Sequence, residues 1–96
     1  MKLYVVVRKD LTSSQQAVQA GHAVAEFLLR CPDTQWNNGT LVYLGVPDEL
    51  SLKYICKKLD IEETIYINFE EPDFGNTITA IASDCESKVF NKLNLL

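Results

Sequence analysis

LYVVVRKDLTSSQQAVQAGHAVA, residues 3–25, joins a strand pattern to a helix pattern across a short polar turn. The β-branched, apolar run Leu3–Val7 is typical of a central strand that is covered on both faces. Residues 10–14 have the composition of a turn and a helix N-cap, and the alanine-rich segment after them has helical periodicity. The stretch therefore predicts a β–α unit, and with it an α/β protein.

The predicted helix begins near Ser13, which stands three residues before Gln16 in capping-box spacing, and it ends before Pro32. One apolar stripe follows the helical period: Ala17, Ala20, Gly21, Val24, Phe27, Leu28 and Cys31. A second stripe consists of Val18, Ala25 and Leu29 and includes the only histidine, His22. We therefore expect this helix to be wide-faced and well covered.

The rest of the chain continues the alternation of strands and helices. Three more strands are expected, at residues 40–46, 64–69 and 76–82. A second helix is expected from Pro47, with a buried stripe of Leu52, Ile55, Cys56 and Leu59. A last helix is expected from a capping box of Ser83 and Glu86. The order β-α-β-α-β-β-α predicts one domain over residues 1–96, a three-layer α/β/α sandwich with a mixed four-stranded sheet.

Composition limits the classes of protein to consider. An apolar content of 47% and a charged content of 23% are those of a folded domain and not of a disordered chain. No apolar run approaches the ~18–20 residues of a membrane span, and the start shows no signal-peptide pattern, so a cytoplasmic protein without a membrane partner is expected. The three cysteines include no C-x-x-C pair, which predicts neither a disulfide framework nor a metal site.

The net charge of −4 argues against a general affinity for nucleic acids, because phosphate contacts need Lys and Arg. A small local basic patch is still compatible with this balance. The candidates for it are Arg8, Lys9, Lys53 and Lys57.

A second polar segment, EEPDFGNTIT at residues 70–79, joins two predicted strands. The simplest structural interpretation is a hairpin in which Gly75 and Asn76 adopt positive φ and Asp73 caps the turn. The functional interpretation begins from His22. A lone histidine on an apolar helix is more often a core residue, but beside a carboxylate it can act as a general base. Asp73 is the carboxylate expected nearby, and Thr77 offers a hydroxyl for an oxyanion or a water.

Three segments together resemble the type 2 peptidyl-tRNA hydrolase (Bit1-like) family. VVVRKDL at residues 5–11 matches the family's first strand and its D-L turn. QQAVQAGHA at residues 15–23 matches the family's K-x-A-A-Q-x-x-H-A, and DFGNT at residues 73–77 matches its D-A-G-x-T. The resemblance covers the whole chain in the order of elements, although only these segments are distinctive.

The resemblance implies a mixed four-stranded sheet with helices on both sides. It also implies hydrolysis of the ester that joins a peptide to the terminal ribose of tRNA, without a metal or another cofactor. His22, Asp73 and Thr77 match positions linked to activity, with His22 and Asp73 as a base or water-positioning pair and Thr77 as a donor to the oxyanion. The residues expected on the substrate side are Arg8, Lys9, Gln15, Gln19 and Asn76, with Gln19 orienting the others.

Two departures from the family pattern favour an alternative. Gln15 stands where the family has a lysine, and the hairpin after the D-x-G motif is shorter and lacks the family's basic residues. The alternative is a non-catalytic binding or interaction module that retains the hydrolase fold. A homodimer is compatible with either function.

Overall fold

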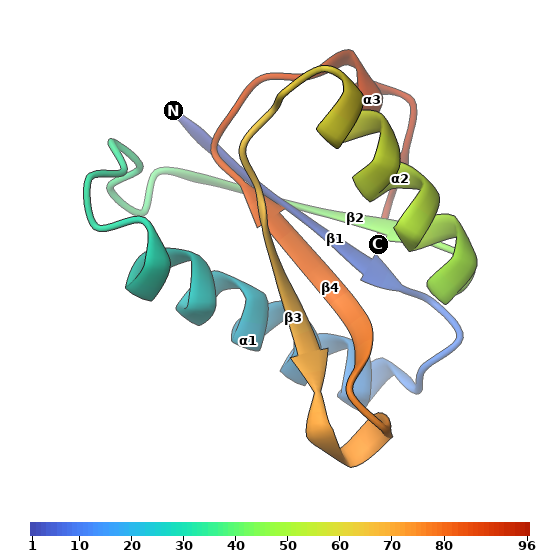
Figure 1. Cartoon of the computed structure of the whole chain (residues 1–96). Coiled ribbons are helices and arrows are strands. Elements are labelled where there is room, and N and C mark those ends of the chain that lie inside the picture. Colours follow the sequence, from blue (N-terminus) through green and yellow to red (C-terminus); the bar gives the residue numbers. More distant parts are fainter.

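Five strands form one sheet in the order β3-β4-β1-β2-β5 in the computed structural model, which describes residues 1–96 (Figure 1). The strands are β1 (Lys2–Arg8), β2 (Thr40–Val46), β3 (Ile67–Glu71), β4 (Thr77–Ser83) and β5 (Asn94–Leu95). The helices are α1 (Ser13–Arg30), α2 (Glu49–Ile61) and α3 (Lys88–Asn91), and a 3-10 turn, η1 (Pro72–Phe74), joins β3 to β4. None of the helices combines the length and the apolar character that crossing a membrane requires.

The sheet is mixed, as predicted, because β1 pairs in parallel with β2 and antiparallel with β4. The predicted count of four strands is wrong. β5 adds a fifth strand at the edge, where Leu95 lies opposite Leu44 and Asn94 opposite Gly45. Two residues are too short a segment to show the alternation by which a strand is recognised in a sequence.

β1 separates two cores, because its side chains alternate between the faces of the sheet. Leu3, Val5 and Val7 pack toward α1, and Tyr4 and Val6 pack toward α2. Figure 1 shows α1 and α2 on opposite sides of the strands. The buried stripe predicted for α2 is confirmed, since Leu52, Ile55, Cys56 and Leu59 all lie in the second core.

α1 begins at Ser13, as predicted, but with a different cap. Thr12 is the N-cap, and its hydroxyl accepts a hydrogen bond from the Gln15 backbone N–H at 3.2 Å while the Gln15 side chain accepts one from the Thr12 N–H at 3.0 Å. The expectation of a well-covered helix is wrong, because Val18 is 54% exposed and Leu29 is 78% exposed. A single face of the helix contacts the sheet, and its buried residues are Gln19, Ala20, Ala23 and Phe27.

The C-terminal helix differs most from its prediction. β4 continues to Ser83, whose hydroxyl donates to the Ile65 carbonyl at 2.6 Å and accepts from the Cys85 N–H at 3.1 Å. Ser83 is therefore a fully buried bridge and not a helix cap. The helix, α3, is a single turn that begins after Ser87.

β3 begins three residues later than predicted, because the preceding residues close α2. The Thr64 N–H donates to the Leu59 carbonyl at 2.9 Å, and Glu63 adopts a positive φ of 59°. Ile65 therefore lies before the strand, and it is 67% exposed.

Candidate functional site

The β3–β4 hairpin forms a tight turn, and part of its predicted geometry is confirmed. Gly75 and Asn76 have φ values of 68° and 60°, as predicted. The cap differs, because the Glu71 side chain and not that of Asp73 accepts a hydrogen bond from the turn, from the Asp73 N–H at 3.5 Å. The Thr77 hydroxyl donates to the Phe74 carbonyl at 2.9 Å, which closes the turn from its other end.

Gln19 connects this hairpin to α1 through a chain of hydrogen bonds. It is 2% exposed, and its Nε2 donates to Oε1 of Glu71 at 2.8 Å. The Thr79 hydroxyl donates to Oε1 of Gln19 at 2.5 Å. Sequence reasoning gave Gln19 an orienting role but missed Glu71 and Thr79. The alternation along β3 carried a signal for Glu71, because it places Glu71 on the same face as Ile67 and Phe69.

A shallow hollow of about 310 Å³ lies where the start of α1 faces this turn. We call it the corner hollow; its lining residues are Ser14, Gln15, Val18, Gln19, Glu71, Asp73 and Phe74. The fold thus brings together Gln15, Gln19 and Asp73, three of the residues singled out in the sequence. It also places two carboxylates there, those of Glu71 and Asp73, and no cation lines the hollow.

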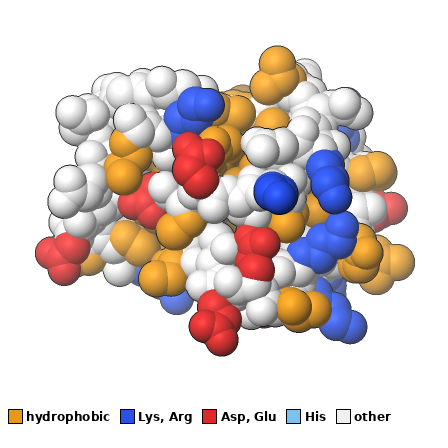
Figure 2. All heavy atoms as spheres, turned by 90° about the horizontal axis from the view of Figure 1, so that it is seen from above, with side chains coloured by type: hydrophobic (Ala, Val, Ile, Leu, Met, Phe, Trp, Pro, Cys, Tyr) orange, Lys and Arg blue, Asp and Glu red, His pale blue; other side chains and the backbone are white.

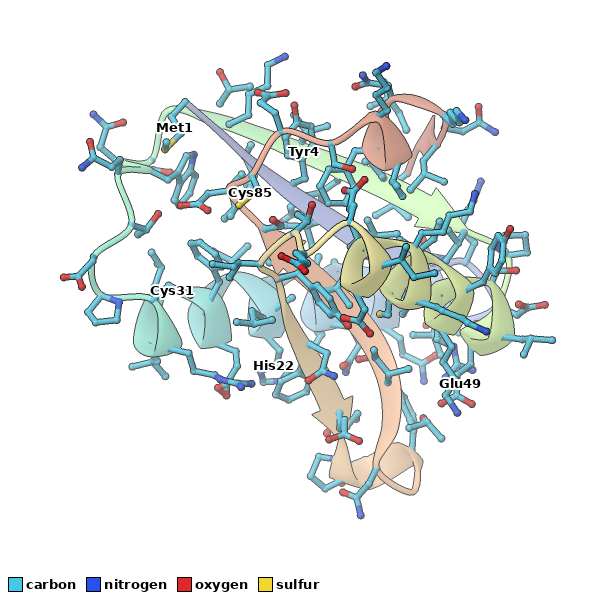
Figure 3. All side chains as sticks on the ribbon, turned by 45° about the horizontal axis from the view of Figure 1, so that its top comes forward. Met1, Tyr4, His22, Cys31, Glu49 and Cys85 are labelled. Atoms are coloured by element: carbon cyan, nitrogen blue, oxygen red, sulfur yellow. The ribbon has the colours of Figure 1, made fainter.

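His22 lies one helical turn beyond Gln19 and points from α1 toward β3 (Figure 3). Its ring is exposed on one side and stacks on Phe69 on the other, with ring centroids 4.5 Å apart and an interplanar angle of 8°. The structure shows no hydrogen bond between His22 and Asp73. The pair expected from the sequence is therefore not joined by a hydrogen bond.

Arg8 holds the other end of the hairpin. Its guanidinium makes a bidentate pair with Asp10 at 3.0 and 2.9 Å. Its Nη1 also donates to the Thr77 hydroxyl and to the Ile78 carbonyl, both at 3.3 Å. The Arg8 side chain is only 14% exposed, and its Nε, Nη1 and Nη2 all donate to partners within the chain.

Carboxylates surround Arg8. Its pKa is raised, first by the hydrogen bond to Asp10 and then by the charges of Asp10, Glu49 and Asp48, which outweigh the lowering effect of burial. Glu49, labelled in Figure 3 at the start of α2, also accepts a hydrogen bond from the Ile78 N–H at 3.1 Å. The positive charge of Arg8 is therefore neutralised within the fold.

This pairing gives the stability a pH dependence. The hydrogen bond from Arg8 lowers the pKa of Asp10 below its ordinary value of 3.8. A carboxylate with a lowered folded-state pKa stabilises the fold above its unfolded pKa, and this contribution is lost as the pH falls through the folded pKa. Urea unfolding at about pH 7 and pH 3 should show that Asp10→Asn reduces the loss of stability in acid, by less than about 1 kcal/mol because Asp10 is 40% exposed.

Asp33→Asn is the matched control, because Asp33 is an exposed carboxylate outside the Arg8 cluster. In Asp33→Asn, the loss of unfolding free energy between about pH 7 and pH 3 should equal that of the wild type. An Asp10→Asn variant with the wild-type acid response would contradict the role of the pair.

The lysines expected beside the site lie elsewhere. The Lys9 side chain lies over Gly45, where an added Cβ would stand 2.6 Å from Lys9 Cδ. Lys53 and Lys57 belong to α2, across the sheet from α1. They line other hollows than Asp73 does.

The α2 side carries a larger hollow that sequence reasoning missed. We call it the α2 hollow; it measures about 620 Å³, and its lining residues are Val46, Pro47, Leu50, Ser51, Lys53, Tyr54, Ile55, Lys57 and Leu93. Leu50 is 78% exposed and Tyr54 is 59% exposed. Figure 2 shows basic side chains among apolar ones on the α2 side of the molecule. The signal in the sequence was the i, i+4, i+7 spacing of Leu50, Tyr54 and Lys57, outside the buried stripe of α2.

A third hollow, of about 270 Å³, separates α2 from the hairpin. Asn76 lines it together with Lys53, Lys57 and three carboxylates, those of Glu49, Asp60 and Glu70. Asn76, expected on the substrate side, thus lines a different hollow from Asp73. No group of three or more His, Cys, Asp or Glu residues is arranged to hold a metal ion.

Comparison of the sequence with protein-family models and with curated proteins finds no match. The structure is similar to that of Atu0240 from Agrobacterium tumefaciens strain C58, a protein of unknown function, with a TM-score of 0.72 and 13% sequence identity. The similarity covers 99% of this chain and 96% of that protein. At this identity the similarity shows the α/β fold alone.

Proposed function

We propose that this chain is a protein-interaction module that binds its partner on the α2 side. One observation carries the proposal: Lys53 and Lys57 frame the largest apolar hollow, across the sheet from the segments that resemble a hydrolase. Apolar hollows with a few well-placed polar groups are typical of binding sites. In this proposal the motifs around Gln19 and Asp73 serve the fold.

The electrostatics of the corner hollow support this choice. A bound tRNA would bring phosphates toward Glu71 and Asp73, and like charges repel. The nearby cation, Arg8, is paired with Asp10. Gln15, which stands in place of the family's lysine, uses its side-chain oxygen to cap α1.

Release of an N-acetylated amino acid from charged tRNA tests the proposal directly. We expect no turnover above background at low salt, about 50 mM, where phosphate contacts are strongest. The wild-type protein and Asp73→Ala should behave alike, because Asp73 makes no side-chain hydrogen bond in the structure. Turnover by the wild type that Asp73→Ala abolishes would overturn the proposal.

That outcome would establish the second candidate, hydrolysis of peptidyl-tRNA. Its supporting observation is the corner hollow, whose lining includes Gln15, Gln19 and Asp73. His22 follows Gln19 by one turn of α1. There Asp73 would position a water, and His22 would act as the base. His22→Ala should then lose turnover as well.

A further inference from the structure

We infer that the α2 hollow binds an acidic amphipathic helix of a partner protein. This inference rests on the proposed function and specifies the chemistry of the partner. Three properties of the α2 hollow support this inference: its shape, the spacing of its residues along α2, and its charge.

The shape fits a helix that lies along α2. Leu50, Tyr54 and Lys57 are spaced i, i+4 and i+7, so they follow one face of α2 for two turns. Val46, Pro47 and Leu93 form the apolar wall beside them. A partner helix with apolar residues at i, i+3 and i+4 would insert those side chains between this wall and α2, as in other helix-in-groove complexes.

The charge specifies an acidic partner. The chain has 13 acidic residues, yet none lines the α2 hollow, whereas Lys53 and Lys57 do. These lysines are four residues apart on a helix, so their Cβ atoms are about 5–6 Å apart. Carboxylates at i and i+4 of a partner helix have the same spacing. The existing contact of Lys53, with Glu49 at 3.9 Å, is exposed and weak enough to be exchanged.

Two other occupants fit the hollow less well. A second copy of this chain that docked symmetrically would bring its own Lys53 and Lys57 against these lysines, and like charges repel. An anionic membrane offers a flat surface, which would contact Leu50 and the lysines but would leave the concave part of the hollow unfilled.

A labelled peptide provides the test with the full chain. The probe is a fluorescein-labelled 18-residue helix with one Leu and Phe stripe flanked by Glu, followed by fluorescence anisotropy. We expect micromolar binding, as for other small interfaces, and at least about tenfold weaker binding to Leu50→Glu and to Lys57→Glu. Both residues are on the surface, so circular dichroism should show that the variants remain folded.

The controls match these variants in chemistry and exposure. Leu29→Glu changes a leucine on α1 that is also 78% exposed, and Lys2→Glu makes the same charge change as Lys57→Glu on β1. Both should bind the peptide like the wild type. A peptide of the same composition without a continuous apolar stripe should bind at least about tenfold more weakly.

Several results would overturn the inference. They are the absence of peptide binding to the wild type, equal binding of the two peptides, and equal binding by Leu50→Glu. Two further results would assign the hollow to another occupant: Leu50-dependent binding to vesicles rich in anionic lipid without peptide binding, or a dimer in solution that Leu50→Glu dissociates. Binding lost in Leu29→Glu alone would move the partner site to α1, which overturns the site on the α2 side but leaves an interaction module. Hydrolysis of charged tRNA without peptide binding would overturn both.

Discussion

Phe90→Ala is expected to lower the free energy of unfolding by about 3–5 kcal/mol, as for other large buried aromatic residues. Phe90 belongs to a helix of one turn, yet it is 2% exposed and packs in the core beneath α2. Its ring stacks on Tyr4 with centroids 4.7 Å apart and an interplanar angle of 15°. A domain of this size has a total stability of about 5–15 kcal/mol, so this one substitution should bring the protein close to unfolding.

Guanidinium unfolding followed by circular dichroism measures this effect. Leu95→Ala is the control, because Leu95 is 73% exposed and its loss should change stability by less than about 0.5 kcal/mol. A loss below about 1 kcal/mol in Phe90→Ala would mean that the C-terminal segment is not anchored by this ring. The hydrogen bond from the Tyr4 hydroxyl to Glu86, at 2.9 Å, and the pairing of β5 with β2 would then be the anchors of that segment.

The elements predicted well from the sequence are those with strong local signals. β1 and β2 are apolar runs long enough to be recognised, and the apolar stripe of α2 follows a helical period without interruption. Gly75 and Asn76 were predicted in positive φ, because Gly has no Cβ to oppose it and Asn tolerates it. At these positions local chemistry and the global fold agree.

The predictions that failed depend on distant partners. Ser83 was the predicted cap of the last helix, but the observed cap is Ser87, because the carbonyl of Ile65, 18 residues away, accepts the hydrogen bond of Ser83. Similarly, β5 exists because α3 turns the chain back toward Leu44. Neither contact produces a recognisable pattern in the neighbouring amino-acid sequence.

The candidate site could be predicted only in part for the same reason. His22 and Asp73 were expected to lie together, with Gln19 orienting them, and the structure places Gln19 and Asp73 at the corner hollow, with His22 outside its lining. The Gln19–Glu71 and Arg8–Thr77 contacts depend on the register of β3 against β4 and of β4 against β1. The placement of Lys53 and Lys57 across the sheet from Asp73 depends on which face of the sheet α2 covers. No local sequence pattern predicts that face.

Gln19 gives the other prediction with a large effect. Gln19→Ala should lower the free energy of unfolding by about 2–4 kcal/mol, because it removes a buried side chain and leaves Thr79 and Glu71 without their shared partner. Gln19→Leu keeps most of the side-chain volume. It should therefore lower the free energy of unfolding by about 1–3 kcal/mol, mainly through the lost hydrogen bonds. Urea unfolding of the two variants separates packing from hydrogen bonding.

A double-mutant cycle decides whether the buried chain acts as a unit. Thr79→Val added to Gln19→Leu replaces both partners of the 2.5 Å hydrogen bond by apolar groups of similar shape. The double variant should then lose less free energy of unfolding than the two single variants lose in sum, by about 0.5–3 kcal/mol. The reason is that neither of the two positions keeps a buried polar group without its partner. Strict additivity would mean that Gln19 and Thr79 contribute independently. A coupled pair would assign this glutamine to holding the hairpin on α1, the role that the interaction-module proposal gives to it.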